Sequence, residues 1–223
     1  MILNKDLNKI TRRLLVCGPV GCILFIGSFF IQGAFREGYT ALRFPISSLS
    51  IGDFGWIQRA NFVISGSLIF LFAFGLRFST MTLKGFIWIS RLIGSVGLGL
   101  VGAGIFSSDP VFGYPMSAPL AIAQFTVHGH LHDFFSIFVF ICLPIACFKF
   151  RNRFKKSGDK WWATYSLISG IGMLVAFFLA AIGFKQIAGF VEVAGVFQRL
   201  SLIIGFAWII LLALHIIKAT EPE

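Results

Sequence analysis

Six long apolar stretches constrain the fold of this chain more than any other feature. They cover about residues 14–32, 57–76, 86–106, 126–148, 162–184 and 198–217. A helix that crosses the hydrocarbon core of a bilayer needs about 20 mainly apolar residues, and each stretch is close to that length. The runs are continuous rather than alternating, which favours helices over the strands of a membrane β-barrel. The sequence therefore predicts an all-α polytopic membrane protein, a six-transmembrane-helix bundle forming one domain over residues 1–223.

The composition agrees with a membrane protein. Hydrophobic residues make up 57% of the chain and charged residues only 13%, whereas soluble domains carry about 25% charged residues. The net charge of +10 is compatible with nucleic-acid binding, but the 28 phenylalanines lie in long apolar runs. We therefore expect membrane lipid as the partner, and no nucleic acid.

The distribution of Lys and Arg predicts the orientation. If both termini are cytoplasmic, thirteen of the nineteen basic residues lie on the inner side and five on the outer side. The inner set includes Lys84 and the cluster at 149–160, and it indicates an N-in, C-in protein of the bacterial inner membrane. The first apolar run is long and lacks an A-x-A site at its exit, so we interpret it as a retained span rather than a cleaved signal peptide.

Polar residues of the predicted spans gather at their outer ends. Ionisable residues in membrane segments are costly and usually face a bundle interior or a wet cavity. The sequence therefore predicts an outward-facing polar pocket formed by residues from several helices: Arg43, Ser47, Ser48, Arg59, Asp109, His128, His132, Asp133, Gln198 and Arg199.

His128 and His132 are the strongest candidates for chemistry. Their i, i+4 spacing places both on one helix face, where two imidazoles can share a metal. Asp109 is the candidate third ligand of a zinc ion, and Asp133 is a candidate orienting partner or general base. The alternative is a structural network in which the histidines hydrogen-bond Asp109, Ser108 or water.

The arginines have two interpretations. Arg43, Arg59 and Arg199 could pair with outer aspartates, or their guanidinium groups could hold a phosphate or carboxylate headgroup. Ser47 and Ser48 are candidate substrate-binding residues, and a nucleophilic role for a serine in this run is a weaker hypothesis. Gln198 completes the predicted binding set.

Several short motifs occur in an order that resembles a known family. They are Arg43-Phe-Pro-Ile-Ser-Ser-Leu-Ser50, Gly55-Trp-Ile-Gln-Arg-Ala-Asn61, Gly104 to Pro110, His128 to Asp133 and Gln198-Arg199. The chain resembles the prokaryotic six-span family catalogued as domain of unknown function 998, which implies a shared site at these motifs but no reaction. A looser similarity is to the zinc-dependent hydrolases of the alkaline ceramidase and adiponectin-receptor type. Those proteins have seven spans, with the histidine pair in the last one.

Three classes of function follow. The first is an intramembrane enzyme, such as a metal-assisted hydrolase, acting on a lipid-like substrate. The second is a haem- or quinone-linked redox protein, which is disfavoured because His215 is predicted at the opposite face of the bilayer from the other histidines. The third is a non-enzymatic transporter, receptor or accessory subunit that binds a ligand in the outer pocket.

Overall fold

The computed structural model describes residues 2–79, 86–111, 113–116, 118, 125–187 and 189–219, and it confirms the predicted all-helical class. Six helices are long and apolar enough to cross a membrane: α1 (Ile2–Phe35), α2 (Gly55–Phe78), α3 (Phe86–Ile105), α4 (Val127–Lys156), α5 (Lys160–Phe184) and α6 (Ala194–Ala219). Two short 3₁₀ helices, η1 (Ile46–Ser50) and η2 (Val191–Val193), lie between them. Within these described ranges no residue belongs to a β-strand.

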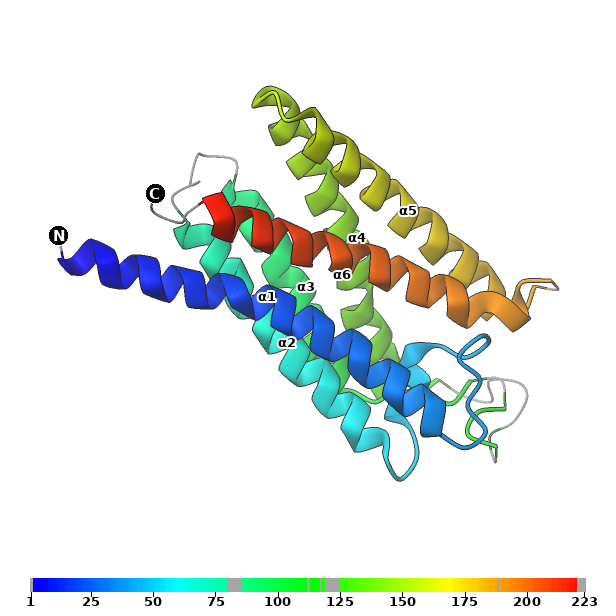
Figure 1. Ribbon diagram of the computed structural model, residues 1–223. Helices are drawn as coiled ribbons and strands as arrows, with labels where there is room; N and C mark the ends of the chain where they lie inside the picture. The colour runs from blue at the N-terminus through cyan, green and yellow to red at the C-terminus, as the bar shows by residue number, and fades with distance from the viewer. Residues whose placement is uncertain are drawn as a thin grey trace.

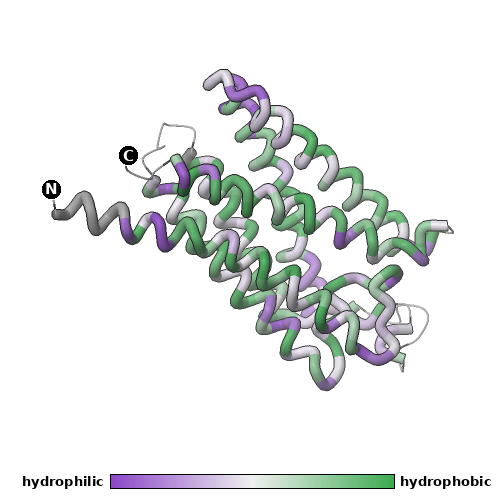
Figure 2. The backbone as a smooth tube through the Cα atoms, in the orientation of Figure 1, coloured by the Kyte–Doolittle hydropathy of each residue, from purple (hydrophilic) through white to green (hydrophobic). Residues whose placement is uncertain are grey.

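The helices form a closed ring. Each helix packs against the next one in the sequence, and α1 also packs against α6 (Figure 1). The start of α1 and the end of α6 lie at the same end of the bundle, which we call the terminal end. The opposite end is where α2, α4 and α6 begin. Hydrophobic residues dominate along the helices, and hydrophilic residues concentrate near their ends (Figure 2).

Several helices extend beyond their predicted apolar stretches. Helix α4 continues through the basic segment to Lys156, and α1 includes the bases that precede the first apolar run. These charged turns extend the helices at the terminal end of the bundle. Lys84, which the charge count assigns to this same side, lies outside the described residues.

Small residues set the closest helix contacts. A Cβ added to Gly97 would lie 2.6 Å from the backbone nitrogen of Phe70, and one added to Gly66 would lie 2.7 Å from the carbonyl oxygen of Gly97. Such an approach of two backbones needs residues without side chains. Helices α2 and α3 therefore pack with their backbones almost in contact.

Buried amides join α1 to α2. The Gln32 side chain donates to Gln58 Oε1 at 2.7 Å, and Asn61 Nδ2 donates to the carbonyl of Phe25 at 3.3 Å. Ser65 completes the series by donating to Asn61 Oδ1 at 3.1 Å. Polar side chains of this kind hold helices together where no hydrophobic effect drives their association.

Candidate functional site

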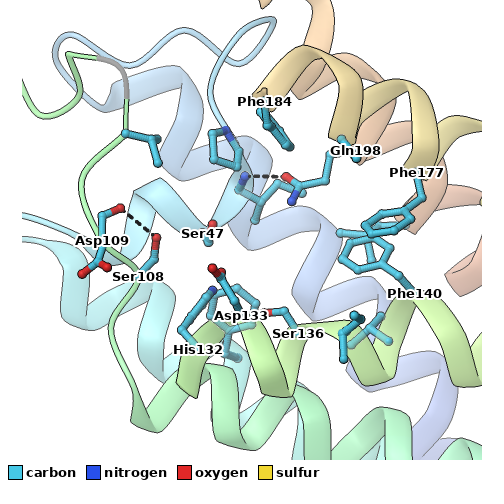
Figure 3. A pocket seen from close by; sticks show the side chains of 18 of the residues that line it. Ser47, Ser108, Asp109, His132, Asp133, Ser136, Phe140, Phe177, Phe184 and Gln198 are labelled. Atoms are coloured by element: carbon cyan, nitrogen blue, oxygen red, sulfur yellow. Dashed lines mark hydrogen bonds between the residues drawn. The ribbon is translucent and has the colours of Figure 1, made fainter. Parts of the chain in front are cut away.

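A cavity of about 410 Å³ lies inside the ring, toward the end where α2, α4 and α6 begin. All six helices and three connecting segments contribute to its wall. Its apolar part includes Phe25, Phe62, Leu100, Phe140, Phe177, Phe184 and Leu202, and its polar part includes Ser47, Ser108, Asp109, His132, Asp133, Ser136, Lys185 and Gln198 (Figure 3). A mainly apolar cavity with a few convergent polar groups is the usual form of a small-molecule site.

One face of α4 forms the principal wall. Asp133, Ser136 and Phe140 follow one another at helical spacing and line the cavity together with His132. Asp133 is exposed, and Figure 3 shows its carboxylate and the hydroxyl of Ser47 pointing toward each other. Polar groups on this wall therefore lie near the beginning of α4, and the phenylalanine lies deeper.

His132 is held by the end of α3. Its Nδ1 lies 2.8 Å from the carbonyl oxygen of Ala103 and 3.0 Å from that of Phe106. Carbonyl oxygens only accept, so these bonds assign the proton of the neutral ring to Nδ1 and leave Nε2 as an acceptor. The ring is 2% exposed, and it meets the Phe62 ring edge to face with centroids 5.8 Å apart. His132 is therefore a fixed, buried side chain of one preferred tautomer.

Asp109 ties the segment after α3 to the beginning of α4. Its Oδ2 accepts from the backbone N–H of Thr126 at 2.9 Å, and its Oδ1 accepts from the Thr126 hydroxyl at 2.6 Å. The Thr126 hydroxyl in turn accepts from the N–H of Gly129 at 3.0 Å and caps the helix. A Cβ on Gly129 would overlap the Asp109 carboxylate, so glycine is what allows this approach.

The segment between α1 and α2 covers the cavity. We call residues 36–54 the cap; within it, Pro45, Ile46 and Ser47 line the cavity wall. The backbone N–H of Ile46 donates to Gln198 Oε1 at 2.8 Å, which fixes the cap to the first turns of α6. Arg36 donates to three cap carbonyls, those of Leu49, Ile51 and Phe54, at 3.0–3.3 Å.

Arg199 forms the second attachment of the cap. Its guanidinium is buried and donates to the carbonyl of Phe44 at 3.0 Å, to that of Gly195 at 2.8 Å and to the hydroxyl of Tyr39. Burial raises the pKa of Tyr39 from its usual 10.0 to about 12, although the positive charge of Arg199 acts in the opposite direction. Tyr39 therefore remains a neutral hydroxyl group at physiological pH.

The structure brings together half of the ten residues of the predicted pocket. Ser47, Asp109, His132, Asp133 and Gln198 line the cavity. The other five are elsewhere or face away, and each of the three arginines among them has partners within the protein.

Arg59 and Arg43 lie at the surface of the bundle rather than on the cavity wall. Arg59 donates to the carbonyls of Gly104 and Ile105 at 3.3 Å each, at the end of α3. Arg43 forms an ion pair with Glu192 at 3.7 Å. Ser48 is fully buried in η1, and its hydroxyl has no hydrogen-bond partner among the described residues.

His128 is exposed and packs against the Phe106 ring, with centroids 5.7 Å apart. It shares the α3-facing side of α4 with His132, as the i, i+4 spacing predicts, but it does not line the cavity. His215 lies near the terminal end of α6, where its ring is 4.8 Å from that of Trp162. The described histidines therefore occupy different environments.

The predicted zinc ligands have partners within the protein. Asp109 is hydrogen-bonded to Thr126 through both carboxylate oxygens, and His132 Nδ1 faces two carbonyls. Among the residues that the structure describes, no three His, Cys, Asp or Glu side chains come together as a metal-binding group. These bonds engage Nδ1 of His132 and not its Nε2, so the zinc site stays a prediction, as does the structural network that is its alternative.

Sequence reasoning missed the apolar half of the site. Phe140 and Phe177 stack with ring centroids 4.3 Å apart and an interplanar angle of 18°, and both line the cavity. Phenylalanines occur throughout the spans, so nothing distinguishes these two in the sequence. Ser136 offered a signal, because it continues the face of His132 and Asp133 by one helical turn.

The fold and the cavity define a six-helix polytopic membrane protein with an internal, mainly apolar chamber near one end. The chain matches the family model described as "Protein of unknown function (DUF998)" over residues 19–215, and it belongs to this family. No solved structure matches the chain.

Proposed function

We propose that this protein binds a lipid-like amphiphile in the cavity, with the polar end of the ligand at Asp133 and Ser47 and its apolar tail among the phenylalanines. The observation that carries the proposal is the division of the cavity wall. The carboxylate, hydroxyl, amide and ammonium groups of the wall lie toward one end, together with apolar side chains such as Val111 and Phe184. The deeper part is lined by aromatic and aliphatic side chains. An amphiphile matches both parts, because its polar group can hydrogen-bond with the polar side chains while its tail packs against the apolar ones.

The exposure pattern of α4 supports entry from the bilayer. Phe134, Ile137, Ile141 and Ile145 form an exposed apolar stripe along this helix. Ile137 is 45% exposed and also lines the cavity, so the cavity adjoins the surface that would face lipid. The cap contributes Pro45, Ile46 and Ser47 to the wall, so a molecule dissolved in the membrane would enter beside Ile137.

The charge distribution supports the outward orientation of this cavity. The basic residues at the end of α4 and the start of α5 lie at the terminal end of the bundle, remote from the cavity. By the positive-inside tendency the terminal end is cytoplasmic. The bound headgroup then lies toward the outer leaflet.

A second function, hydrolysis of the bound amphiphile, is favoured by one observation. The carbonyls of Ala103 and Phe106 hold His132 Nδ1–H and leave Nε2 free to accept a proton. Ser47 is the hydroxyl side chain of the cap on the cavity wall and is the candidate nucleophile. Trapping of Ser47 by a fluorophosphonate, abolished in Ser47→Ala and weakened in His132→Gln, would support it; equal labelling of all three proteins would exclude it.

Filling the cavity tests binding directly. Ala181 lines the cavity on α5, whereas Val175 on the same helix is 53% exposed. We expect Ala181→Trp to abolish binding of a 1-monoacylglycerol to the purified protein, and Val175→Trp to leave it unchanged. Native mass spectrometry of the detergent-released protein counts the bound molecules. Equal binding by wild type and Ala181→Trp, or no binding by wild type, would contradict the proposal.

A further inference from the structure

The cavity has a polar end and an apolar end. On three helices the lining side chains change from polar to apolar in the same direction through the bundle. On α4 the order is Asp133, Ser136, Phe140; on α6 it is Gln198, Leu202. Helix α5 is antiparallel to these two. Its C-cap residue Lys185 and Phe184 line the polar end, and Phe177 lies deeper. With a rise of 1.5 Å per residue, Asp133 and Phe140 are separated by about 10 Å along the helix axis.

A close-packed layer of buried side chains lies beyond the apolar end of the cavity. Leu143, Met173 and Phe206 are 0–1% exposed and do not line the cavity. Met173 and Leu143 meet near Gly205, where an added Cβ would lie 2.6 Å from Met173 Cε and 2.7 Å from Leu143 Cδ2, and the Phe206 ring packs against that of Phe25 with centroids 5.3 Å apart. The chamber therefore ends at this layer, and its last lining side chains include the stacked Phe140 and Phe177.

The volume limits the ligand further. Cavities for drug-sized molecules measure about 300–1,000 Å³, and 410 Å³ is near the lower limit. A chamber of this size and of about 10 Å depth suits one short apolar chain better than the two chains of a phospholipid.

We propose that the Phe140–Phe177 pair is a length gauge: it closes the apolar end and selects single-chain amphiphiles by the length of the tail. This inference rests on the proposed function, because it requires that a tail enters the cavity. Phe140 comes from α4 and Phe177 from α5, so the pair also holds together the two helices between which it lies. Truncation of Phe177 enlarges the apolar end and removes no polar group from the site.

The test uses a series of 1-monoacylglycerols of increasing chain length, bound to the full-length protein in mild detergent. Wild type is expected to show an affinity maximum at one short chain length. Phe177→Ala is expected to move that maximum to longer chains and to improve binding of the first chain beyond the wild-type maximum about tenfold. Phe178→Ala is the matched control, because Phe178 is the neighbouring residue, is 60% exposed and does not line the cavity.

The outcomes separate the two proposals. If wild type binds no chain of the series, the proposed function fails. If wild type binds with a maximum that Phe177→Ala does not move, or that Phe178→Ala moves equally, the length gauge fails while the proposed function stands. Phe177→Leu is the second variant, since it keeps an apolar side chain between α4 and α5 and is expected to move the maximum by a smaller step.

Discussion

The attachment of the cap and the α4 wall of the cavity both contain polar side chains near the same end of the bundle. These side chains differ in whether they are hydrogen-bonded within the protein or face the cavity. At the cap, Arg36 donates to backbone carbonyls, and Arg199 donates to backbone carbonyls and to Tyr39. Both guanidinium groups are therefore hydrogen-bonded within the protein. On the α4 wall, Asp133 and Ser136 face an open chamber. Position near the cavity end of a span therefore does not distinguish a binding residue from a structural one. The partners that each side chain already has make that distinction.

The largest expected effect is on the cap. Arg199→Met removes a buried donor from the carbonyls of Phe44 and Gly195 and from the Tyr39 hydroxyl, and we expect it to lower the free energy of unfolding by about 3 kcal/mol. Thermal unfolding in detergent measures the change. Arg59→Met is the control, because Arg59 is exposed and its loss is expected to cost less than about 1 kcal/mol. Similar losses for both variants would contradict the structural role of Arg199.

The junction of Asp109 with α4 should give the next largest effect. Gly129→Ala places a Cβ in the space of the Asp109 carboxylate and is expected to cost about 2 kcal/mol by overpacking. On the Asp109→Ala background the same substitution is expected to cost much less, because the overlap is gone. A double-mutant cycle in thermal unfolding measures the coupling. Strictly additive effects would show that the two residues do not share this space.

On the α4 wall we expect a loss of binding without a loss of stability. Asp133→Asn keeps the shape of an exposed side chain, so the free energy of unfolding is expected to change by less than about 0.5 kcal/mol. The affinity for 1-monoacylglycerol is expected to fall about tenfold, equivalent to about 1.4 kcal/mol. A titration and an unfolding curve on the same preparation check both. Reduced stability with unchanged affinity would place Asp133 with the structural residues.

The smallest effect concerns Tyr39. Its pKa is about 12 in the folded protein and 10.0 in the reference state, so the folded state retains the proton over a pH range in which the unfolded state loses it. The resulting stabilisation is complete below pH 10.0 and is lost as the pH rises toward 12. At about pH 10.5 we expect wild type to have lost less than about 1 kcal/mol through this group. Tyr39→Phe should remove that part of the pH dependence, and an identical slope in both proteins would contradict it.

The sequence was sufficient to predict the architecture. Six continuous apolar runs predicted six helices, and the third run contains several glycines, of which Gly97 meets Gly66 of α2 in the structure. Hydropathy and small-residue patterns act locally or between neighbouring helices, so they are readable without coordinates.

The site could be predicted only in part. The clustering of polar residues located Ser47, Asp109, His132, Asp133 and Gln198 at one end of the bundle. It did not reveal that Arg199 attaches the cap, because that depends on the carbonyl of Phe44, which is 155 residues away in the chain. It also did not reveal the stacked phenylalanines, which become a distinct pair only through the packing of α4 on α5.

The most direct test of the central claim is photolabelling by a 1-monoacylglycerol with a diazirine at the end of its tail. We expect the label on Phe140, Phe177 and their cavity-lining neighbours, competed by unlabelled monoacylglycerol and blocked by Ala181→Trp but not by Val175→Trp. Label confined to the exposed stripe of α4 or to Phe178, and insensitive to Ala181→Trp, would show that the amphiphile stays outside the bundle and would contradict the account.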